Sequence, residues 1–303
     1  MKTQRDALWE QLYIEAKQHR DVILISADMG APSLDQIRRD FPHQFVNTGI
    51  AEQNAILVGS GLAKEGKDVF VYAIASFLTL NCIEKIRVQN CMMKIPLHIV
   101  GVGAGFSYAD SGPTHHLIED LSVMRSLPNM NIFSITDAYM AKDYAANYKQ
   151  LKGTNYVRLD RQATSDLYQA PIDWDKGFCL LRNAGDVLVI ATGSMTHQAC
   201  ELQKELPKFS VLDLYRFPVD QEQFYKTISK YKQIITLEEH VLAGGLGSYV
   251  LELLSDGELS IPVKRCGITN DQGYCYRYGG REELLKHHGL DKASLAHLLQ
   301  AYV

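Results

Sequence analysis

The sequence lacks long apolar segments, a surplus of basic residues and paired cysteines. Its longest uncharged run, residues 69–83, is too short to span a bilayer and contains polar side chains. The formal net charge of -4 argues against a nucleic-acid binder, which would need a basic face. The six cysteines show no Cys-x-x-Cys and no metal-binding spacing, which favours reduced thiols in a cytoplasmic protein. The polar residues 1–6 also lack the apolar core of a signal peptide. Together, these absences predict that the protein has neither a membrane nor a nucleic acid as a partner.

What the chain does contain is a regular alternation of strand-like and helical segments. A hydrophobic content of 46% and a charged content of 22% fit a soluble α/β protein. Continuous apolar runs such as residues 22–25 are typical of parallel strands that helices cover on both faces. In the first half we expect strands at 22–25, 44–47, 69–74, 97–102, 131–135 and 155–159, and helices at 3–19, 51–65, 77–93, 117–127 and 137–149.

The length of 303 residues predicts two domains, each an open and mostly parallel sheet. We expect the first domain at residues 1–165, a linker without periodicity at 166–177, and the second domain at 178–303. Its expected strands lie at 187–191, 211–214 and 233–237, and its helices at 196–205, 220–230, 245–255 and, in pieces, 281–302. Ligands of such sheets bind beyond the carboxyl ends of the strands. Four loops of the first domain meet that description: residues 27–30, 47–54, 74–77 and 101–116.

Residues 47–54 place an acidic residue at the start of a helix. The following helix, 51–65, is apolar almost all round, so we expect it to be buried, with its glycines permitting close approach of another backbone. Glu52 would then lie at the edge of a buried element, where desolvation favours a protonated carboxyl group suited to proton transfer. Alternatively, Glu52 only stabilises the positive end of the helix.

Residues 111–120 contain two adjacent histidines. Thr114 is placed to cap a following helix, which is one interpretation of this segment. The other places His115, with or without His116, over a pocket as a hydrogen-bond donor or proton carrier near neutral pH. Two adjacent side chains point in different directions, so we expect only one of them to contact a ligand. No third ligand at a supporting spacing suggests a metal site here.

Two glycine-rich segments do not fit nucleotide or phosphate loops. In residues 101–106 the third glycine comes too early and no helix follows directly, so the dinucleotide fingerprint fails. Residues 238–248 open a helix after a strand, but they lack the P-loop lysine and begin with two carboxylates that would repel phosphate. We interpret the glycines of residues 244–247 as sites of close helix–strand packing, and those of residues 101–105 as part of a mobile loop that approaches a ligand closely.

In this order the segments resemble the transketolase family of thiamine-diphosphate enzymes, specifically its pyrimidine-binding and C-terminal domains. The resemblance covers nearly the whole chain, and it is the ordered set of motifs that makes it specific. The motifs are Ser26-Ala27-Asp28-Met29, Gly49-Ile50-Ala51-Glu52-Gln53-Asn54, Ser76-Phe77 with Arg87, Gly112-Pro113-Thr114-His115, Ser126-Leu127-Pro128-Asn129, Arg161-Gln162 and Glu238-Glu239-His240.

The resemblance implies roles for individual residues. In the family, a glutamate matching Glu52 bonds the aminopyrimidine ring of thiamine diphosphate and favours the imino tautomer that removes the thiazolium C2 proton. An aromatic residue matching Phe77 stacks on the pyrimidine. A histidine matching His115 contacts the substrate or the intermediate, and Arg161 matches a residue that binds the phosphate of a sugar phosphate. The resemblance therefore assigns catalysis to Glu52 and His115, cofactor binding to Asp28, Ile50, Glu52, Phe77 and Arg87, and substrate binding to Asp110, His115, His116 and Arg161.

The chain departs from the family pattern at three places. Two further aromatics of the family are replaced by Leu80 and Ile83, and residues 100–108 lack the histidine that binds the donor's hydroxyls in transketolases. The aspartate that precedes Gly-Pro-Thr-His is displaced to Asp110, with Ser111 between. The donor sugar therefore stays open. The leading hypothesis is transfer of a two-carbon ketol unit from a ketose or its phosphate to an aldehyde.

Three alternatives remain beside that hypothesis. A beta-type subunit of a 2-oxoacid dehydrogenase would share the cofactor and both domains, but would pass an acyl group to a lipoyl carrier. A deoxyxylulose-phosphate-synthase-like enzyme would condense pyruvate. A non-catalytic assembly or regulatory subunit would keep only the fold, although packing alone does not require Glu52, Phe77 and His115 together.

The diphosphate-binding half of the family is missing from these residues. No Gly-Asp-Gly followed by a metal-binding asparagine occurs in the sequence. The resemblance therefore implies a split enzyme, in which a separate diphosphate-binding subunit supplies the Mg²⁺ ligands and this chain holds no metal of its own. Active sites of the family lie between chains, which implies a dimer or a heterotetramer.

Overall fold

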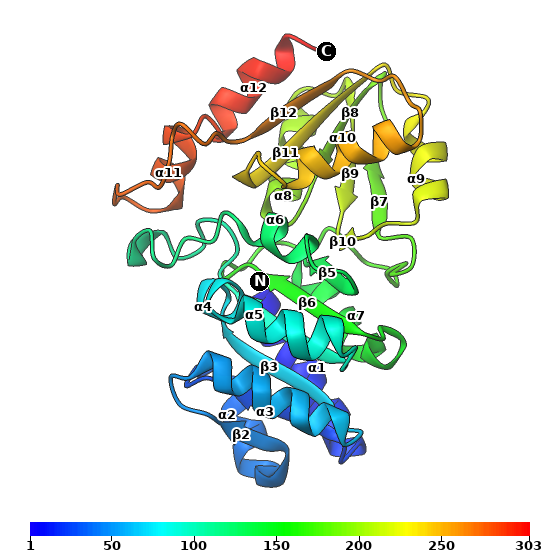
Figure 1. Cartoon of the computed structure of the whole chain (residues 1–303). Helices are drawn as coiled ribbons and strands as arrows, with labels where there is room; N and C mark the ends of the chain where they lie inside the picture. Colours follow the sequence, from blue (N-terminus) through cyan, green and yellow to red (C-terminus); the bar gives the residue numbers. More distant parts are fainter. The chain divides into compact units, whose positions relative to one another are not determined.

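The computed structural model describes residues 1–303, except for the side chain of Ser33. The chain folds into two compact units (Figure 1). The first unit comprises residues 1–104 and 123–172, and the second comprises residues 105–122 and 173–303. Segment 105–122 thus belongs with the second unit. The division expected from the sequence, at residues 165 and 178, places this segment in the first domain instead.

A parallel sheet forms the centre of the first unit. Within this unit the strands follow the order β5-β6-β4-β3-β1-β2, and their pairings are parallel. Strands β1, β4 and β6 are buried along their whole length, as expected for strands covered on both faces. The strands are β1 Val22–Ser26, β2 Phe45–Asn47, β3 Asp68–Ile74, β4 Leu97–Val102, β5 Met130–Ser134 and β6 Thr154–Leu159.

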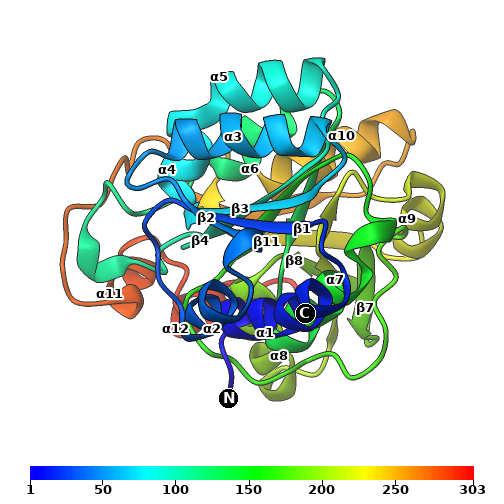
Figure 2. The same ribbon diagram turned by 90° about the horizontal axis from the view of Figure 1, so that it is seen from below.

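Helices cover both faces of this sheet. Figure 2 shows α3, α4 and α5 on one face and α1, α2 and α7 on the other. Gly59 allows α3 to approach β3 closely, because a Cβ at this position would lie 2.8 Å from Val71 Cγ2. The helices are α1 Gln4–Gln18, α2 Pro32–Asp40, α3 Glu52–Lys64, α4 Ala75–Thr79, α5 Ile83–Lys85 and α7 Ala138–Asn147, with α6 at Asp120–Arg125 where the chain passes between the units.

The expectation that α3 is buried all round is wrong for the single chain. One face of the helix packs on the sheet through Ala55, Ile56 and Gly59. The opposite face is open: Leu57 is 39% exposed, and Gly61 is exposed as well. Composition alone could not show this, because a helix with an apolar outer face has the same sequence whether or not a second chain covers it.

The expected helix at 77–93 is a series of short segments. After α4 come a 3₁₀ turn at Leu80–Cys82, the short α5 and a π-helical stretch at Ile86–Met92. The Thr79 hydroxyl donates to the Ala75 carbonyl at 2.6 Å, a local side-chain bond of the kind that bends helices. π-helical turns are frequent near functional sites.

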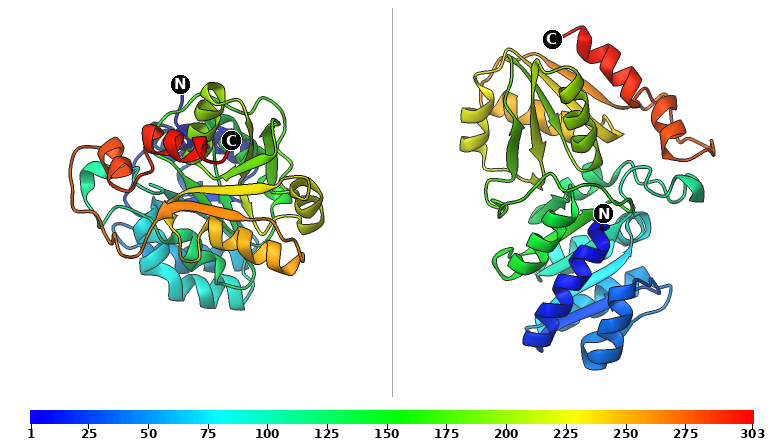
Figure 3. Two further views of the ribbon diagram at one scale, coloured as in Figure 1. Left: turned by 90° about the horizontal axis from the view of Figure 1, so that it is seen from above. Right: turned by 180° about the vertical axis from the view of Figure 1, so that it is seen from behind.

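The second unit contains a sheet of five strands in the order β12-β11-β8-β9-β7. β7 is antiparallel to β9, and the other pairings are parallel. Helix α10 lies on one face of the sheet and α8 on the other, with α12 beside α8 (Figures 1 and 3). The elements are β7 Phe178–Arg182, β8 Val187–Ala191, α8 Ser194–Glu205, β9 Phe209–Leu214, β10 Arg216–Phe217, α9 Gln221–Ile228, β11 Gln233–Val241, α10 Leu246–Asp256, β12 Val263–Ile268, α11 Arg281–His287 and α12 Lys292–Gln300.

The pH dependence of stability should report on a buried histidine of the first unit. The ring of His98 stacks on Phe70 at a centroid distance of 4.4 Å, and its Nδ1 lies 2.7 Å from the Tyr144 hydroxyl. Burial lowers the pKa of His98 from 6.5 to about 3. The unfolded chain takes up a proton on this histidine near the ordinary pKa of 6.5. The stability that the neutral His98 contributes is therefore fully present above pH 6.5, and it is lost as the pH falls from 6.5 toward the folded pKa.

We therefore expect His98 to contribute about 1.4 kcal/mol per pH unit to the loss of unfolding free energy within this window. His98→Gln removes the titrating group, so the variant's slope of unfolding free energy against pH should be shallower than that of the wild type by about one proton. Urea unfolding over a series of pH values measures both slopes, with the exposed His43→Gln as the control. Parallel slopes for wild type and His98→Gln would contradict the assignment.

Candidate active site

Four loops at the carboxyl edge of the first sheet carry the predicted residues of that unit. Asp28 follows β1, Glu52 follows β2, Phe77 follows β3, and Arg161 follows β6. Because these strands are parallel, their carboxyl ends share one edge, where ligands of such sheets bind. Arg87 is exposed on the π-helical stretch.

Asn47 joins the loops after β1 and β2. Its Oδ1 accepts from the Asp28 backbone N–H at 3.2 Å and from the Gly49 N–H at 2.9 Å, while its Nδ2 donates to Asp28 Oδ1 at 3.3 Å. Asp28 has a φ of 56° and Gly49 a φ of 70°. A non-glycine residue in the left-handed region is strained, and such strain persists where the surroundings impose it. Asn47 supplies this constraint, and no motif in the sequence indicates it.

An open depression surrounds Glu52. It has a volume of about 440 Å³ and is lined by residues 50–54 together with Leu57 and Asn81. Glu52 is half-buried, whereas Ile50 at its rim is 84% exposed. The depression therefore combines one carboxylate with apolar side chains that this chain leaves in contact with water.

Phe77 and Cys82 lie on the helical segments beside α3. Phe77 is half-buried, and the Cys82 thiol lies 3.4 Å from the Phe77 carbonyl oxygen. Burial, together with the nearby negative charge of Glu52, raises the pKa of Cys82 to about 12, so this thiol stays protonated. Gln53 Nε2 donates to the Asn81 carbonyl at 3.0 Å and fixes the start of α3 against this segment.

The second unit presents the two histidines on a loop closed by an isolated bridge between Gly105 and Leu117. His115 is half-buried, and its Nδ1 lies 3.1 Å from the Thr114 hydroxyl. Thr114 does not cap a helix, because α6 begins only at Asp120. The expected helix at 117–127 is thus shorter than its apolar pattern suggests.

His116 points into the unit. Its exposed fraction is 4%, and its ring packs edge-on against Phe106 at 5.2 Å. Burial lowers the pKa of His116, so the imidazole is more readily neutral than in water. His115 is therefore the more accessible of the two, while Asp110 is exposed on a 3₁₀ turn at Ala109–Ser111.

Glu239 holds the beginning of this loop. Its Oε1 accepts from the Phe106 N–H at 3.0 Å and from Arg281 Nε at 3.0 Å, and its Oε2 accepts from the Ser194 hydroxyl at 3.1 Å. A Cβ on Gly105 would lie 2.7 Å from the Glu239 carboxyl carbon, so only glycine fits. Glu239 thus positions the segment that carries His115.

The neighbouring Glu238 contacts the glycine-rich turn that opens α10. Its carboxylate accepts from the Leu246 N–H at 2.6 Å and the Gly247 N–H at 2.8 Å, which occupies the amino end of α10. A Cβ on Gly247 would lie 2.7 Å from Thr236 Oγ1, which agrees with the expected close helix–strand packing.

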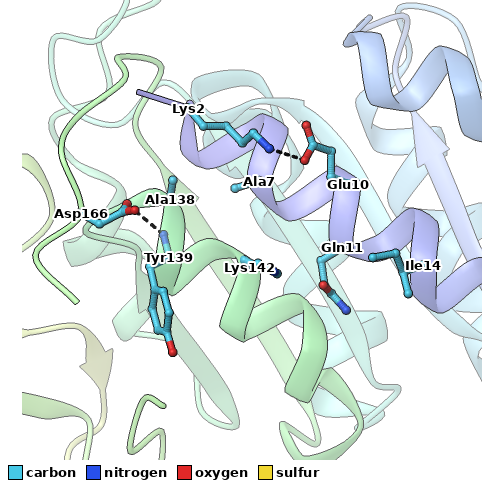
Figure 4. A pocket seen from close by; sticks show the side chains of 9 residues that line it. All are labelled: Lys2, Ala7, Glu10, Gln11, Ile14, Ala138, Tyr139, Lys142 and Asp166. Carbon is cyan, nitrogen blue, oxygen red and sulfur yellow. Dashed lines mark hydrogen bonds and ion pairs between the residues drawn. The ribbon is translucent and has the colours of Figure 1, made fainter. Parts of the chain in front are cut away.

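A second hollow of the first unit lies away from these loops. It has a volume of about 340 Å³ and opens between α1 and α7 (Figure 4). Lys2 and Glu10 form an ion pair at its rim, and the Tyr139 N–H donates to Asp166 at 3.2 Å. None of its lining residues belongs to the predicted site.

None of the helices in the described part of the chain combines the length and the hydrophobicity that a membrane span requires.

The chain matches two protein families in sequence. Residues 1–165 match the family "Transketolase, pyrimidine binding domain", and residues 179–295 match "Transketolase, C-terminal domain". One of the subunits of the apulose-4-phosphate transketolase of Phocaeicola vulgatus is 32% identical over 302 residues, covering 96% of this chain and 94% of the relative. The 1-deoxy-D-xylulose-5-phosphate synthase of Synechococcus sp. is 31% identical over 92% of this chain, which spans 44% of that longer enzyme.

A solved structure agrees with these matches. It is described as a split gene transketolase, inactive beta4 tetramer, and it superposes with a TM-score of 0.84 at 30% identity, covering 99% of this chain and 97% of the other. The fold class predicted from the sequence, two open and mostly parallel α/β sheets, is confirmed. By its two matched domains and its relatives, the chain belongs to the transketolase family, of which it carries the pyrimidine-binding and C-terminal domains.

Proposed function

We propose that this chain is the pyrimidine-side subunit of a two-subunit, thiamine-diphosphate-dependent transketolase that is active only with a diphosphate-binding partner. Together the subunits would transfer a two-carbon ketol unit from a ketose, or its phosphate, to an aldehyde. The partner would supply the Mg²⁺ ligands, and the assembly would be a dimer or a heterotetramer.

The depression around Glu52 is the observation that carries this proposal. A half-buried carboxylate is surrounded there by Ile50 and Leu57, which are 84% and 39% exposed. Exposed apolar side chains around one polar group are typical of an interface or a ligand site. The wall that would enclose the carboxylate is therefore expected from a second chain. The split-gene structure described as an inactive beta4 tetramer supports the need for a different partner.

The residues present fit the pyrimidine end of the cofactor. A carboxyl group and an apolar rim match a flat heteroaromatic ring that carries a nitrogen acceptor, and Phe77, on the adjoining helix α4, offers an aromatic ring for stacking. When bound, thiamine diphosphate would supply a carbanion nucleophile for the ketose carbonyl. Glu52 would hold a proton toward the ring nitrogen, Phe77 would orient the ring, and Ile50 with Leu57 would exclude water. Asp28, fixed by Asn47, and Arg87 are proposed to support this end of the site.

Substrate-binding roles are proposed for residues of each unit separately. Arg161 is exposed after β6 and can present its forked donors to a phosphate. His115, held on its loop by Glu239, would donate to a hydroxyl or carbonyl oxygen of the sugar. His116 and Asp110 are proposed to support that loop.

Arg161→Ala should raise the KM for a ketose phosphate by about 10- to 100-fold, because charge-assisted hydrogen bonds to the phosphate are lost. The kcat should change little, since the phosphate lies away from the reacting carbons. Steady-state kinetics with the assembled enzyme measures both parameters. Arg20→Ala, exposed before β1 at the opposite edge of the sheet, is the matched control. An unchanged KM in Arg161→Ala would remove Arg161 from the phosphate site.

Mixing experiments test the function itself. We expect this chain alone to show no ketose cleavage, and the chain mixed with its diphosphate-binding partner to transfer a two-carbon unit in a thiamine-diphosphate-dependent reaction. The alternative of a deoxyxylulose-phosphate-synthase-like condensation has pyruvate as its donor, and a 1-deoxy-D-xylulose-5-phosphate synthase is among the relatives. Turnover of pyruvate with release of carbon dioxide, and none of a ketose, would replace the transketolase assignment by that condensation.

A further inference from the structure

A cluster of one thiol and two imidazoles lies in the second unit. Cys275, His287 and His288 each place one ligand atom within 4.8 Å of the other two. Cys275 and His288 are buried, with exposed fractions of 4% and 6%, while His287 is exposed. The rings of the adjacent His287 and His288 lie edge to face, with centroids 4.8 Å apart. No sequence motif indicates this grouping, because the loop at 269–280 and α11 bring the residues together only in the folded chain.

The hydrogen bonds around His288 leave one of its nitrogens available. Its Nδ1 lies 3.2 Å from Gln272 Oε1, and the same oxygen accepts from the Thr269 N–H at 3.1 Å. Gln272 Oε1 is a carbonyl oxygen and can only accept hydrogen bonds, so His288 Nδ1 must be the donor and carries the hydrogen. In a neutral imidazole, Nε2 then keeps its lone pair. His288 Nε2 is buried without a hydrogen-bond partner. A buried nitrogen with a free lone pair is costly unless a ligand uses it.

We propose that Cys275 Sγ, His288 Nε2 and one ring nitrogen of His287 bind a Zn²⁺ ion. Thiolate and imidazole are the ligands that Zn²⁺ prefers, and Gln272 takes the outer position that orients a metal-binding histidine. To reach the bond lengths of a tetrahedral Zn²⁺ ion, the three ligand atoms must move closer to one another by about 1 Å than their present separations of up to 4.8 Å. The Cys275 S–H bond is replaced by an S–Zn bond and its proton passes to solvent. The exposed His287 side provides the entry path and a fourth position for water.

Such an ion would fix the loop at 269–280 to α11 beside the segment that carries His115. His288 stacks on Phe106 at a centroid distance of 5.3 Å, and Phe106 contacts His116 at 5.2 Å. Tyr278 from the same loop lies next to Gly112, since a Cβ there would be 3.1 Å from the tyrosine hydroxyl. The metal is therefore structural: it links the loop at 269–280 to α11 next to the segment that carries His115, and it takes no part in the thiamine chemistry.

Cobalt titration of the full chain tests the site. The reduced protein is stripped with a chelator, dialysed, and titrated with Co²⁺ and then with Zn²⁺. We expect saturation at one Co²⁺ per chain, with a thiolate-to-cobalt charge-transfer band and the intense visible bands of a tetrahedral ion, both displaced by Zn²⁺. Cys275→Ser and His288→Gln should abolish the bands, and Gln272→Ala should weaken binding by about 10- to 100-fold.

Controls separate this site from other thiols and from misfolding. Cys179→Ser and His297→Gln remove a thiol and an imidazole elsewhere in the second unit and should keep the bands. His287→Gln changes an exposed side chain, so it tests ligation even if the buried variants fold poorly. Absence of a thiolate band in the wild type, or its persistence in Cys275→Ser or His287→Gln, would overturn the proposal.

Discussion

Replacing Glu52 by glutamine is expected to lower the kcat of the assembled enzyme by about 10²–10⁴-fold, the range that a positioned acid–base group contributes. The amide has the same shape, but it cannot hold and release a proton toward the cofactor ring. Glu52 is half-buried at the start of α3, so the substitution should leave the fold intact. Initial rates with saturating thiamine diphosphate and ketose measure the effect, and circular dichroism verifies folding.

Glu65→Gln is the matched control for this experiment. Glu65 follows the carboxyl end of the same helix and is exposed, so its substitution should leave kcat within about twofold of the wild type. An assembled Glu52→Gln enzyme with wild-type kcat would show that Glu52 only stabilises the positive end of α3. The non-catalytic alternative would then gain support.

Glu239→Ala is expected to lower the free energy of unfolding by about 3–5 kcal/mol, as for other buried ion pairs that lose one partner. The carboxylate is 3% exposed, and Arg281 beside it is 10% exposed. Its loss leaves the guanidinium without this counter-charge and the Phe106 N–H without its acceptor. Urea unfolding measures the stability, and amide exchange at Phe106 measures the loosening of the loop that carries His115.

Two further variants distinguish the cause of that loss. Glu239→Gln keeps an oxygen acceptor without the charge and should lose less stability than Glu239→Ala. Glu222→Ala, an exposed change in α9, should stay within about 0.5 kcal/mol of the wild type. If Glu239→Ala matches Glu222→Ala in stability and leaves Phe106 exchange unchanged, Glu239 does not position the loop.

Strands β1, β3 and β4 of the first unit could be predicted because each is a short, mainly apolar run that is buried almost throughout. Other elements escaped prediction for physical reasons. α2 is a short helix of nine residues rich in charged side chains, and β12 contains Lys264 and Arg265 and is fully buried only at Cys266 and Ile268. The breaks within residues 75–92 depend on local bonds such as that of Thr79, which an apolar pattern does not contain.

The common edge shared by the candidate residues could be predicted from consecutive loops, whereas contacts between residues distant in sequence could not. The parallel sheet brings Asp28, Glu52, Phe77 and Arg161 to one edge, as the strand pattern indicates. The bonds of Asn47, and those of Glu239 to residues 133 and 42 positions away in sequence, arise only in the folded chain. The open face of α3 was misjudged because its apolar residues do not reveal which chain covers them.

Calorimetric titration of thiamine diphosphate with Mg²⁺ tests most directly whether this chain is half of an active site. We predict no measurable heat of binding with the chain alone, and stoichiometric binding with an equimolar mixture of the chain and its diphosphate-binding partner, accompanied by ketose cleavage. Tight, stoichiometric binding of the cofactor by the chain alone would contradict the account.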